Sequence, residues 1–190
     1  MRIVYIDIDS LRPDHLTCYG YRRQTSPNID RLADHGVRFT NCYASDMPCA
    51  PSRMAMFSGR FGYHNGVVCH YGRRGDPYMD FQERGFRESP LTEFMWVNCL
   101  KRAGMNTVTI SPFAARHGLY HFLTGFNECY DPGGYGHGTA EELTPRAIDW
   151  LERNGISENW FLHVNYWDVH IPYQMPDSLD SPFEDDPPHN

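Results

Sequence analysis

Short apolar runs recur along the chain, separated by longer segments with the character of helices. Residues 3–8 (Ile-Val-Tyr-Ile-Asp-Ile) form the first run. Their β-branched, almost entirely apolar composition is typical of a buried strand. Further strands are expected at residues 37–44, 106–111 and 160–167.

Residues that commonly begin and end helices stand between these runs. Ser26 before Pro27 is typical of an N-cap and a first helical turn, and Thr139 with Glu142 has the spacing of a capping box. Glycine commonly closes a helix. Helices are therefore expected from Pro27 to Gly36, from Pro51 to Gly59, from Pro90 to Gly104 and from Thr139 to about Asn154, with a long irregular loop over residues 72–90.

Strands that alternate with helices predict an α/β fold, in which a largely parallel sheet is flanked by helices. Ligands bind such sheets beyond the carboxyl ends of the strands. Asp9 follows the first predicted strand, Cys49 lies in the loop after the second, and Asp168 and His170 follow the fourth. We expect one domain over residues 1–175, and an acidic, proline-rich loop or tail over residues 176–190.

The overall composition is that of a globular protein, with 41% apolar and 22% charged residues. A net charge of -7 argues against a nucleic-acid partner, although a local anion site remains compatible with it. No apolar run approaches the ~20 residues of a membrane span, and the first residues lead directly into the first predicted strand. The chain as given is expected to be cytoplasmic, and an exported parent with its leader removed would look the same.

Six cysteines occur without a Cys-x-x-Cys pair, so neither disulfides nor a structural zinc site are expected. Cys49 opens the segment Cys-Ala-Pro-Ser-Arg, whose proline suits a first helical turn. Backbone N–H groups and the helix dipole favour an anion at such a terminus. Arg53 lies one turn later on the same face, so both residues could converge on one anionic group. Taken alone, a cysteine near the start of a helix is more often a small buried residue.

Other candidate residues follow the remaining strands. Asp9 could bind Ca²⁺ or Mg²⁺, or serve as a turn residue. His170 could donate a proton or hold an oxyanion. Arg116 and His117 could reach an anion from the loop after residue 111. His163, inside the last strand, is expected to be a core residue.

These segments resemble the sulfatase family. Residues 49–53 match its Cys-x-Pro-Ser-Arg motif, and residues 54–59 and 66–67 resemble the sequence that follows that motif. Residues 6–20 resemble the family's metal-binding N-terminal strand and its successor, and residues 168–172 resemble its histidine-proline segment. The resemblance covers essentially the whole chain, and it implies the N-terminal part of an alkaline-phosphatase-like α/β domain that is incomplete here.

The resemblance also implies a mechanism, cofactors and partners. The motif cysteine is converted to formylglycine, whose hydrated aldehyde is the nucleophile toward a sulfate ester. Cys49, Arg53, His117 and His170 are then catalytic candidates, and Arg116 and His170 are substrate-binding candidates. One divalent cation is implied, with Ca²⁺ favoured over Mg²⁺ and neither excluded. The expected partners are a sulfated small molecule or carbohydrate and the formylglycine-generating enzyme.

The sequence departs from the family in three places. The family often has two adjacent aspartates after the first strand, but Ser10 follows Asp9 here, which leaves Asp7 as a substitute ligand beside Asp9 and Cys49. The family's Gly-Lys-Trp-His segment is missing, and Arg116 and His117 are the candidate replacements. The family's second pair of metal ligands and a substrate lysine lie further along than this chain extends.

Two other functions remain open at this point. One is a phosphonate or phosphate ester hydrolase of the same superfamily, and the other is an inert fragment or non-catalytic binding module. Because part of the expected site is missing, we expect the 190-residue chain alone to be inactive and prone to self-association.

Overall fold

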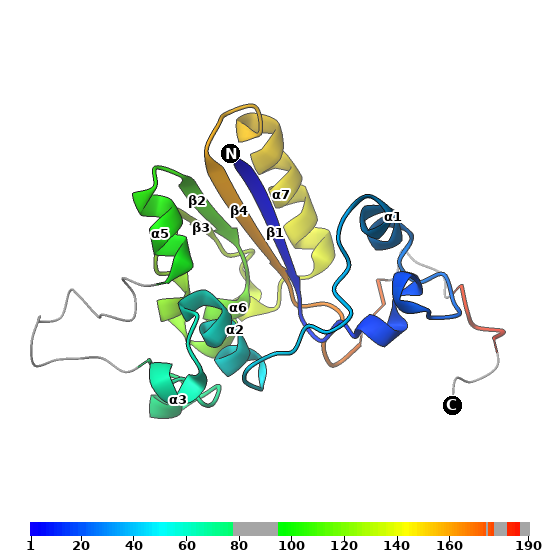
Figure 1. Ribbon diagram of the computed structural model, residues 1–190, viewed down its shortest axis with the longest axis horizontal. Helices are drawn as coiled ribbons and strands as arrows, with labels where there is room; N and C mark the ends of the chain where they lie inside the picture. Colours follow the sequence, from blue (N-terminus) through cyan, green and yellow to red (C-terminus); the bar gives the residue numbers. More distant parts are fainter. Residues whose placement is uncertain (78–94, 174, 177–181, 187–190) are drawn as a thin grey trace, which may run out of the picture.

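A parallel sheet of four strands organises the chain, as the computed structural model shows for residues 1–77, 95–173, 175–176 and 182–186 (Figure 1). Its order is β1-β4-β2-β3, and every neighbouring pair is parallel. The expected α/β fold with a parallel sheet is therefore confirmed. The strands are β1 (Arg2–Ile8), β2 (Asn106–Ile110), β3 (Glu128–Tyr130) and β4 (Trp160–Tyr166).

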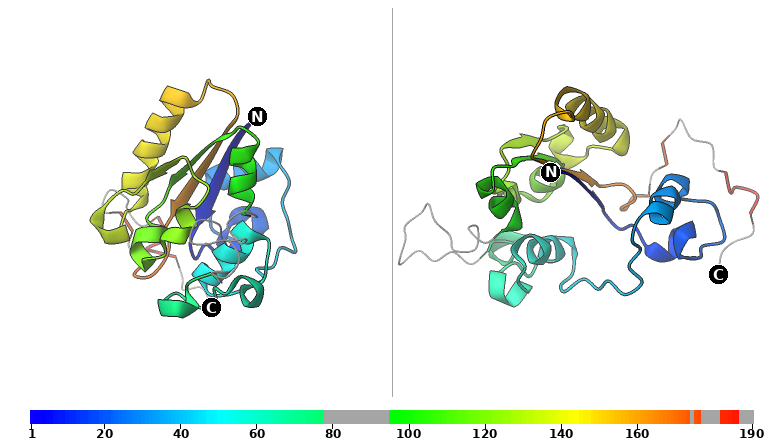
Figure 2. Two further views of the ribbon diagram at one scale, coloured as in Figure 1. Left: turned by 90° about the vertical axis from the view of Figure 1, so that its left-hand side faces the viewer. Right: turned by 45° about the horizontal axis from the view of Figure 1, so that its top comes forward.

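Helices lie on both sides of this sheet (Figure 2). The longest begins at a capping box in which Glu142 accepts a hydrogen bond from the Thr139 backbone N–H at 2.9 Å, as the sequence predicts. The helices are α1 (Pro27–His35), α2 (Cys49–Ser58), α3 (Gly62–Asn65), α5 (Trp96–Arg102), α6 (Phe113–His117) and α7 (Ala140–Asn154).

Strand β4 separates two apolar clusters because its side chains alternate between the two faces of the sheet. Leu162 and Val164 pack with Trp150 of α7 on one face. Phe161 packs with Phe57 of α2 and with neighbouring apolar residues on the other face. Residues on the second face of the sheet therefore point toward α2, the helix that carries Cys49.

Strand β1 forms an edge of the sheet and is covered on one face. Ile3 and Tyr5 pack against the cluster around α2, whereas Val4 and Ile6 on the opposite face are 48% and 52% exposed. Asp7 follows the covered alternation and so lies on the same side of the sheet as α2.

The prediction of a strand at residues 37–44 is wrong. The segment has no regular structure, bends at residues 40–41 and pairs with no strand of the described residues, and Val37, Phe39 and Tyr43 are 82%, 69% and 86% exposed. It connects α1 with α2 away from the sheet (Figure 1). Cys49 therefore follows an irregular connection instead of a second strand, and it is itself the first residue of α2.

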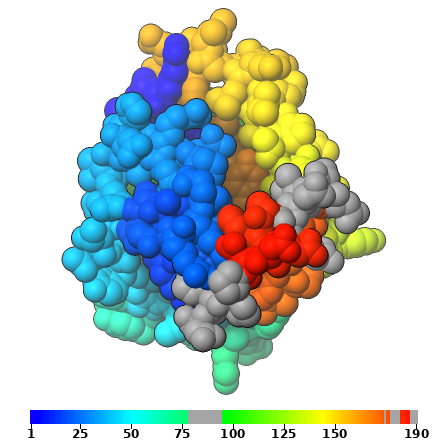
Figure 3. All heavy atoms as spheres, turned by 90° about the vertical axis from the view of Figure 1, so that its right-hand side faces the viewer, coloured from blue at the N-terminus to red at the C-terminus, as the bar shows by residue number. Residues whose placement is uncertain are grey.

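Three other sequence predictions fall partly outside the described residues. The start of the helix expected from Pro90, and most of the loop expected at residues 72–90, lie outside these residues. The remainder of that helix is α5. Within the tail at 176–190, residues 182–186 pack against the N-terminal segment (Figure 3), where Arg23 pairs with Asp186 at 2.8 Å.

No helix in the described parts of the chain has the length and apolar character needed to cross a membrane.

We expect the protein to lose stability as the pH falls from about 6.5 to 4, partly through His121. Burial lowers the pKa of this histidine from 6.5 to about 4. The unfolded chain then binds a proton in this window before the folded chain does, so the free energy of unfolding falls with the pH. Urea unfolding at several pH values should show a shallower dependence for His121→Leu. The variant His35→Leu, at the end of α1, is the control, and an unchanged dependence in His121→Leu would contradict the prediction.

Candidate active site

The helix α2 places Cys49 at its first position. Pro48 before it is extended, and its carbonyl accepts the Ser52 N–H at 3.0 Å, which closes the first turn. Pro51 suits this turn because proline needs no intrahelical partner for its nitrogen there. Cys49 is half-buried and packs beside the apolar cluster of α2.

The Cys49 thiol lies against an imidazole from a distant loop. Its Sγ atom is 2.8 Å from Nε2 of His70. Burial, with a smaller contribution from Asp9, raises the pKa of the Cys49 thiol. Burial lowers the pKa of His70. Both shifts favour a neutral thiol beside a neutral imidazole, not a thiolate–imidazolium pair.

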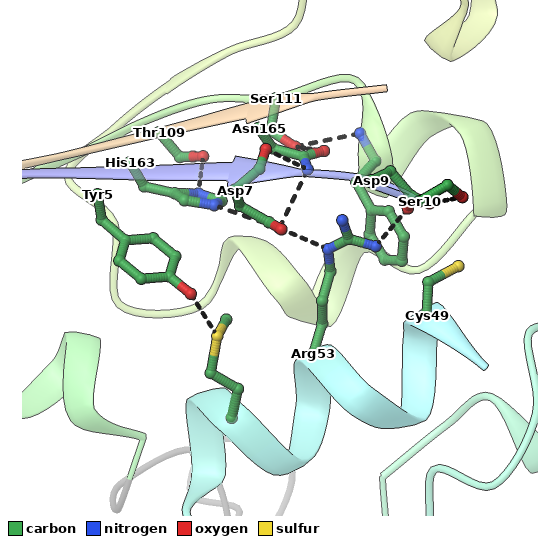
Figure 4. Close-up of polar contacts among 12 residues, drawn as sticks. Tyr5, Asp7, Asp9, Ser10, Cys49, Arg53, Thr109, Ser111, His163 and Asn165 are labelled. Carbon is green, nitrogen blue, oxygen red and sulfur yellow. Dashed lines mark hydrogen bonds and ion pairs between the residues drawn. The ribbon is translucent and has the colours of Figure 1, made fainter. Parts of the chain in front are cut away.

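Arg53, one turn after Cys49, reaches from α2 to two carboxylates at the end of β1 (Figure 4). Its Nε donates to Asp7 at 2.6 Å and its Nη1 donates to Asp9 at 2.8 Å. The guanidinium carbon also lies 4.4 Å from the centre of the Phe113 ring. Arg53 and Asp9 are 7% and 5% exposed, so this ion-paired group is largely shielded from water.

Asp7 is held by a network from the neighbouring strand β4. Asn165 donates to its carboxylate at 3.0 Å, and Nε2 of His163 lies 3.9 Å from it. Burial alone would raise the pKa of Asp7, but the contact with His163 and the charge of Arg53 outweigh burial and lower it to about 2. His163 is 4% exposed and contacts Thr109 at 2.9 Å, so its placement in the core is confirmed.

His117, the last residue of α6, brings a second imidazole to Cys49. Its ring stacks on that of His70, with centroids 5.0 Å apart and planes 15° apart. Burial, followed by the nearby charges of His70 and Arg116, lowers the pKa of His117 to about 4. His117 is therefore neutral near pH 7.

Arg116 and His170 meet at Trp167, just beyond β4. The guanidinium carbon of Arg116 lies 3.8 Å from the centre of one Trp167 ring, which is a cation–π contact. The His170 ring stacks on Trp167 with a centroid separation of 4.0 Å. Asp168 lies between Trp167 and His170 in the sequence. It accepts the Ala140 N–H at 2.6 Å and so caps the first turn of α7.

The sequence-predicted residues thus lie around the carboxyl ends of β1 and β4, close to the start of α2. Cys49 and Arg53 share α2, but Arg53 contacts the carboxylates of Asp7 and Asp9 directly. Sequence reasoning missed His70, which lies 21 positions after Cys49 in a stretch with no periodic pattern. No local signal could have identified it.

Several solved structures share this fold, among them a protein described as a member of the alkaline phosphatase superfamily. One, determined with its substrate D-glucosamine-2-N,6-O-disulfate, is 20% identical with a TM-score of 0.67, over 90% of this chain and 35% of that chain. A superfamily protein from Vibrio parahaemolyticus is 19% identical with a TM-score of 0.63, over 95% and 43%. Phosphonate monoester hydrolase of Agrobacterium radiobacter is 20% identical with a TM-score of 0.64, over 93% and 42%. The expected fold is confirmed.

Comparison of the amino-acid sequence with known proteins identifies the family of this chain. The sulfatase family model matches residues 2–189. Iduronate 2-sulfatase of Mus musculus is 48% identical over 200 residues, which cover 93% of this chain and 36% of that enzyme. The chain belongs to the sulfatase family, as its N-terminal motifs indicate, and it spans about a third of the length of this curated relative.

Proposed function

We propose that the full-length protein is a sulfuric ester hydrolase whose catalytic residue is made from Cys49. The observation that carries the proposal is the position of the Cys-Ala-Pro-Ser-Arg segment. It begins a helix, and its arginine joins that helix to Asp7 and Asp9 at the end of β1. Membership of the sulfatase family also supports hydrolysis of a sulfuric ester as the function.

Residue 49, as formylglycine, would supply a hydrated aldehyde as the nucleophile toward sulfur, which is covalent catalysis. The enzyme that makes formylglycine is then a required partner. Cys49 is half-buried and near the start of α2, where backbone N–H groups favour an anionic group. The chain therefore holds the reacting residue at a place suited to a sulfate.

A divalent cation fits the charges around Asp9. Asp7 and Asp9 carry two negative charges and Arg53 carries one positive charge, so this shielded group is left with a net negative charge. Burying an uncompensated charge is costly, and a cation would compensate it. Asp9, Asp7 and residue 49 are the candidate ligands, and an all-oxygen set completed by other residues would suit Ca²⁺ better than Mg²⁺.

The surrounding cations and imidazoles suit the remaining roles. His117 is neutral near pH 7, so it can accept a proton from a hydroxyl group. Arg116 and His170 lie together on Trp167 and are the candidates to bind the sulfate oxygens. Arg53 would act by fixing the two carboxylates.

A sulfated carbohydrate or small molecule is the proposed substrate class. The positive charge of Arg53 is already opposed by Asp7 and Asp9, so among the described residues of the site only Arg116, together with the proposed divalent cation, supplies positive charge for the substrate, and the field there is modest. That field favours a sulfate monoester with one negative charge over a phosphate monoester with nearly two. A phosphonate ester hydrolase is the second candidate, favoured by the similar fold of phosphonate monoester hydrolase.

The test is an assay of the full-length protein on three aryl esters that share one leaving group: a sulfate, a phosphate and a methylphosphonate. We expect the highest kcat/KM on the sulfate, loss of activity with a chelator, and recovery with Ca²⁺. A higher kcat/KM on the phosphonate would replace the first candidate with the second. Full activity after complete removal of divalent cations would contradict the proposed cation.

A further inference from the structure

Cys49, His70 and His117 form a cluster distinct from the carboxylates. Their ligand atoms, one sulfur and two imidazole nitrogens, all lie within 4.8 Å of one another. Among the described residues, this is the group of three or more such side chains close enough to hold a metal ion. Asp7 and Asp9, the candidate ligands of the divalent cation, are paired with Arg53 and are not members of this cluster.

The His117 ring provides an independent indication of a ligand. Both of its nitrogens are shielded from water, and neither has a hydrogen-bond partner among the described residues. Buried polar atoms without partners are uncommon and costly. A metal ion beside Sγ of Cys49 would give one of these nitrogens a partner.

The donor types select the metal. A thiolate and two imidazoles suit Zn²⁺, whereas Ca²⁺ takes oxygen ligands. Four-coordinate Zn²⁺, with Zn–S of ~2.3 Å and Zn–N of ~2.0–2.1 Å, requires donor atoms roughly 3–4 Å apart. The cluster can reach that spacing with small side-chain shifts, since Sγ lies 2.8 Å from Nε2 of His70 and all three ligand atoms lie within 4.8 Å of one another. The charge of Arg53 is offset by two carboxylates, so it does not forbid a cation nearby.

We propose that the unconverted protein, in which residue 49 is still cysteine, binds one Zn²⁺ through Cys49, His70 and His117. The thiol releases its proton to solvent as the Zn–S bond forms, and water takes the fourth position. Conversion of Cys49 to formylglycine removes the sulfur and with it this site. The bound ion is thus coordinated by the Cys49 thiolate until conversion takes place. The inference does not depend on which ester the enzyme hydrolyses.

The experiment uses Co²⁺ as a spectroscopic substitute for Zn²⁺, on full-length protein whose Cys49 is shown by peptide mass to be unconverted. We expect one equivalent of Co²⁺ to give thiolate-to-metal absorption that Zn²⁺ displaces. Cys49→Ala and His70→Ala should remove this absorption and weaken Zn²⁺ binding by at least about 100-fold, beyond the loss caused by removing an outer-shell partner. Cys69→Ala and His64→Ala, the nearby controls, should leave both unchanged.

A second measurement covers the case in which a variant folds poorly. In the wild-type protein, Zn²⁺ should slow alkylation of Cys49 by iodoacetamide at least tenfold, as followed by peptide mass spectrometry, while Cys69 stays reactive. Absence of thiolate absorption in the wild-type protein would overturn the inference. So would unchanged absorption in Cys49→Ala or in a folded His70→Ala, or equal alkylation of Cys49 with and without Zn²⁺. None of these readouts uses sulfatase activity, so their failure leaves the proposed function to its own assay.

Discussion

Replacing Cys49 by alanine in the full-length protein is expected to lower kcat/KM on an aryl sulfate by at least about 10⁴-fold, as the loss of a covalent nucleophile does elsewhere. The reason is that alanine cannot become formylglycine. The fold should survive, because Cys49 is half-buried at a helix end and alanine is a good helix former. Steady-state kinetics and thermal unfolding of the same samples check both parts.

The matched control is Cys69→Ala, which removes a thiol twenty positions later, beside His70. It should retain near-normal kcat/KM. Turnover of Cys49→Ala within a few fold of wild type, in a sample free of other sulfatases, would refute the role given to Cys49.

Replacing Arg53 by alanine is expected to destabilise the full-length protein by about 3–5 kcal/mol, the usual cost of breaking a buried ion pair. The change leaves the carboxylates of Asp7 and Asp9 without their cation in a shielded place. Denaturant unfolding measures the loss. Adding Asp7→Asn to Arg53→Ala should recover part of it, because one uncompensated charge is removed.

Arg153→Ala is the control for this second prediction. It breaks an exposed pair between Arg153 and Asp149 on α7, one helical turn apart, which is worth no more than about 0.5 kcal/mol. Equal losses for Arg53→Ala and Arg153→Ala would show that the carboxylates at the end of β1 do not depend on Arg53.

The sequence predicts the parts of the fold in which local pattern and burial agree. Strands β1 and β4 are apolar runs, and they lie in the sheet as expected. Residues 37–44 mix apolar residues with Arg38, Thr40 and Asn41 and lie outside the sheet, because an apolar pattern does not reveal whether a neighbouring strand will accept the hydrogen bonds of a segment. The three-residue strand β3 is too short for any periodicity to indicate it.

The site also contains residues that the local sequence places correctly and residues that it does not. Cys49 and Arg53 lie within five residues of each other, so helical spacing alone is enough to place both on one helix, α2. His70 reaches Cys49 from a loop, and His163 reaches Asp7 from a strand that follows it by more than 150 residues. Such contacts are set by tertiary packing, which no local pattern records.

Peptide mass spectrometry of the segment that contains Cys49, from full-length protein made in a host with the formylglycine-generating enzyme, tests the central claim most directly. We predict the mass of an aldehyde at residue 49, a fraction of converted protein that rises in proportion to sulfatase activity, and no such mass at Cys69. An active protein whose residue 49 remains entirely a cysteine thiol would contradict the account.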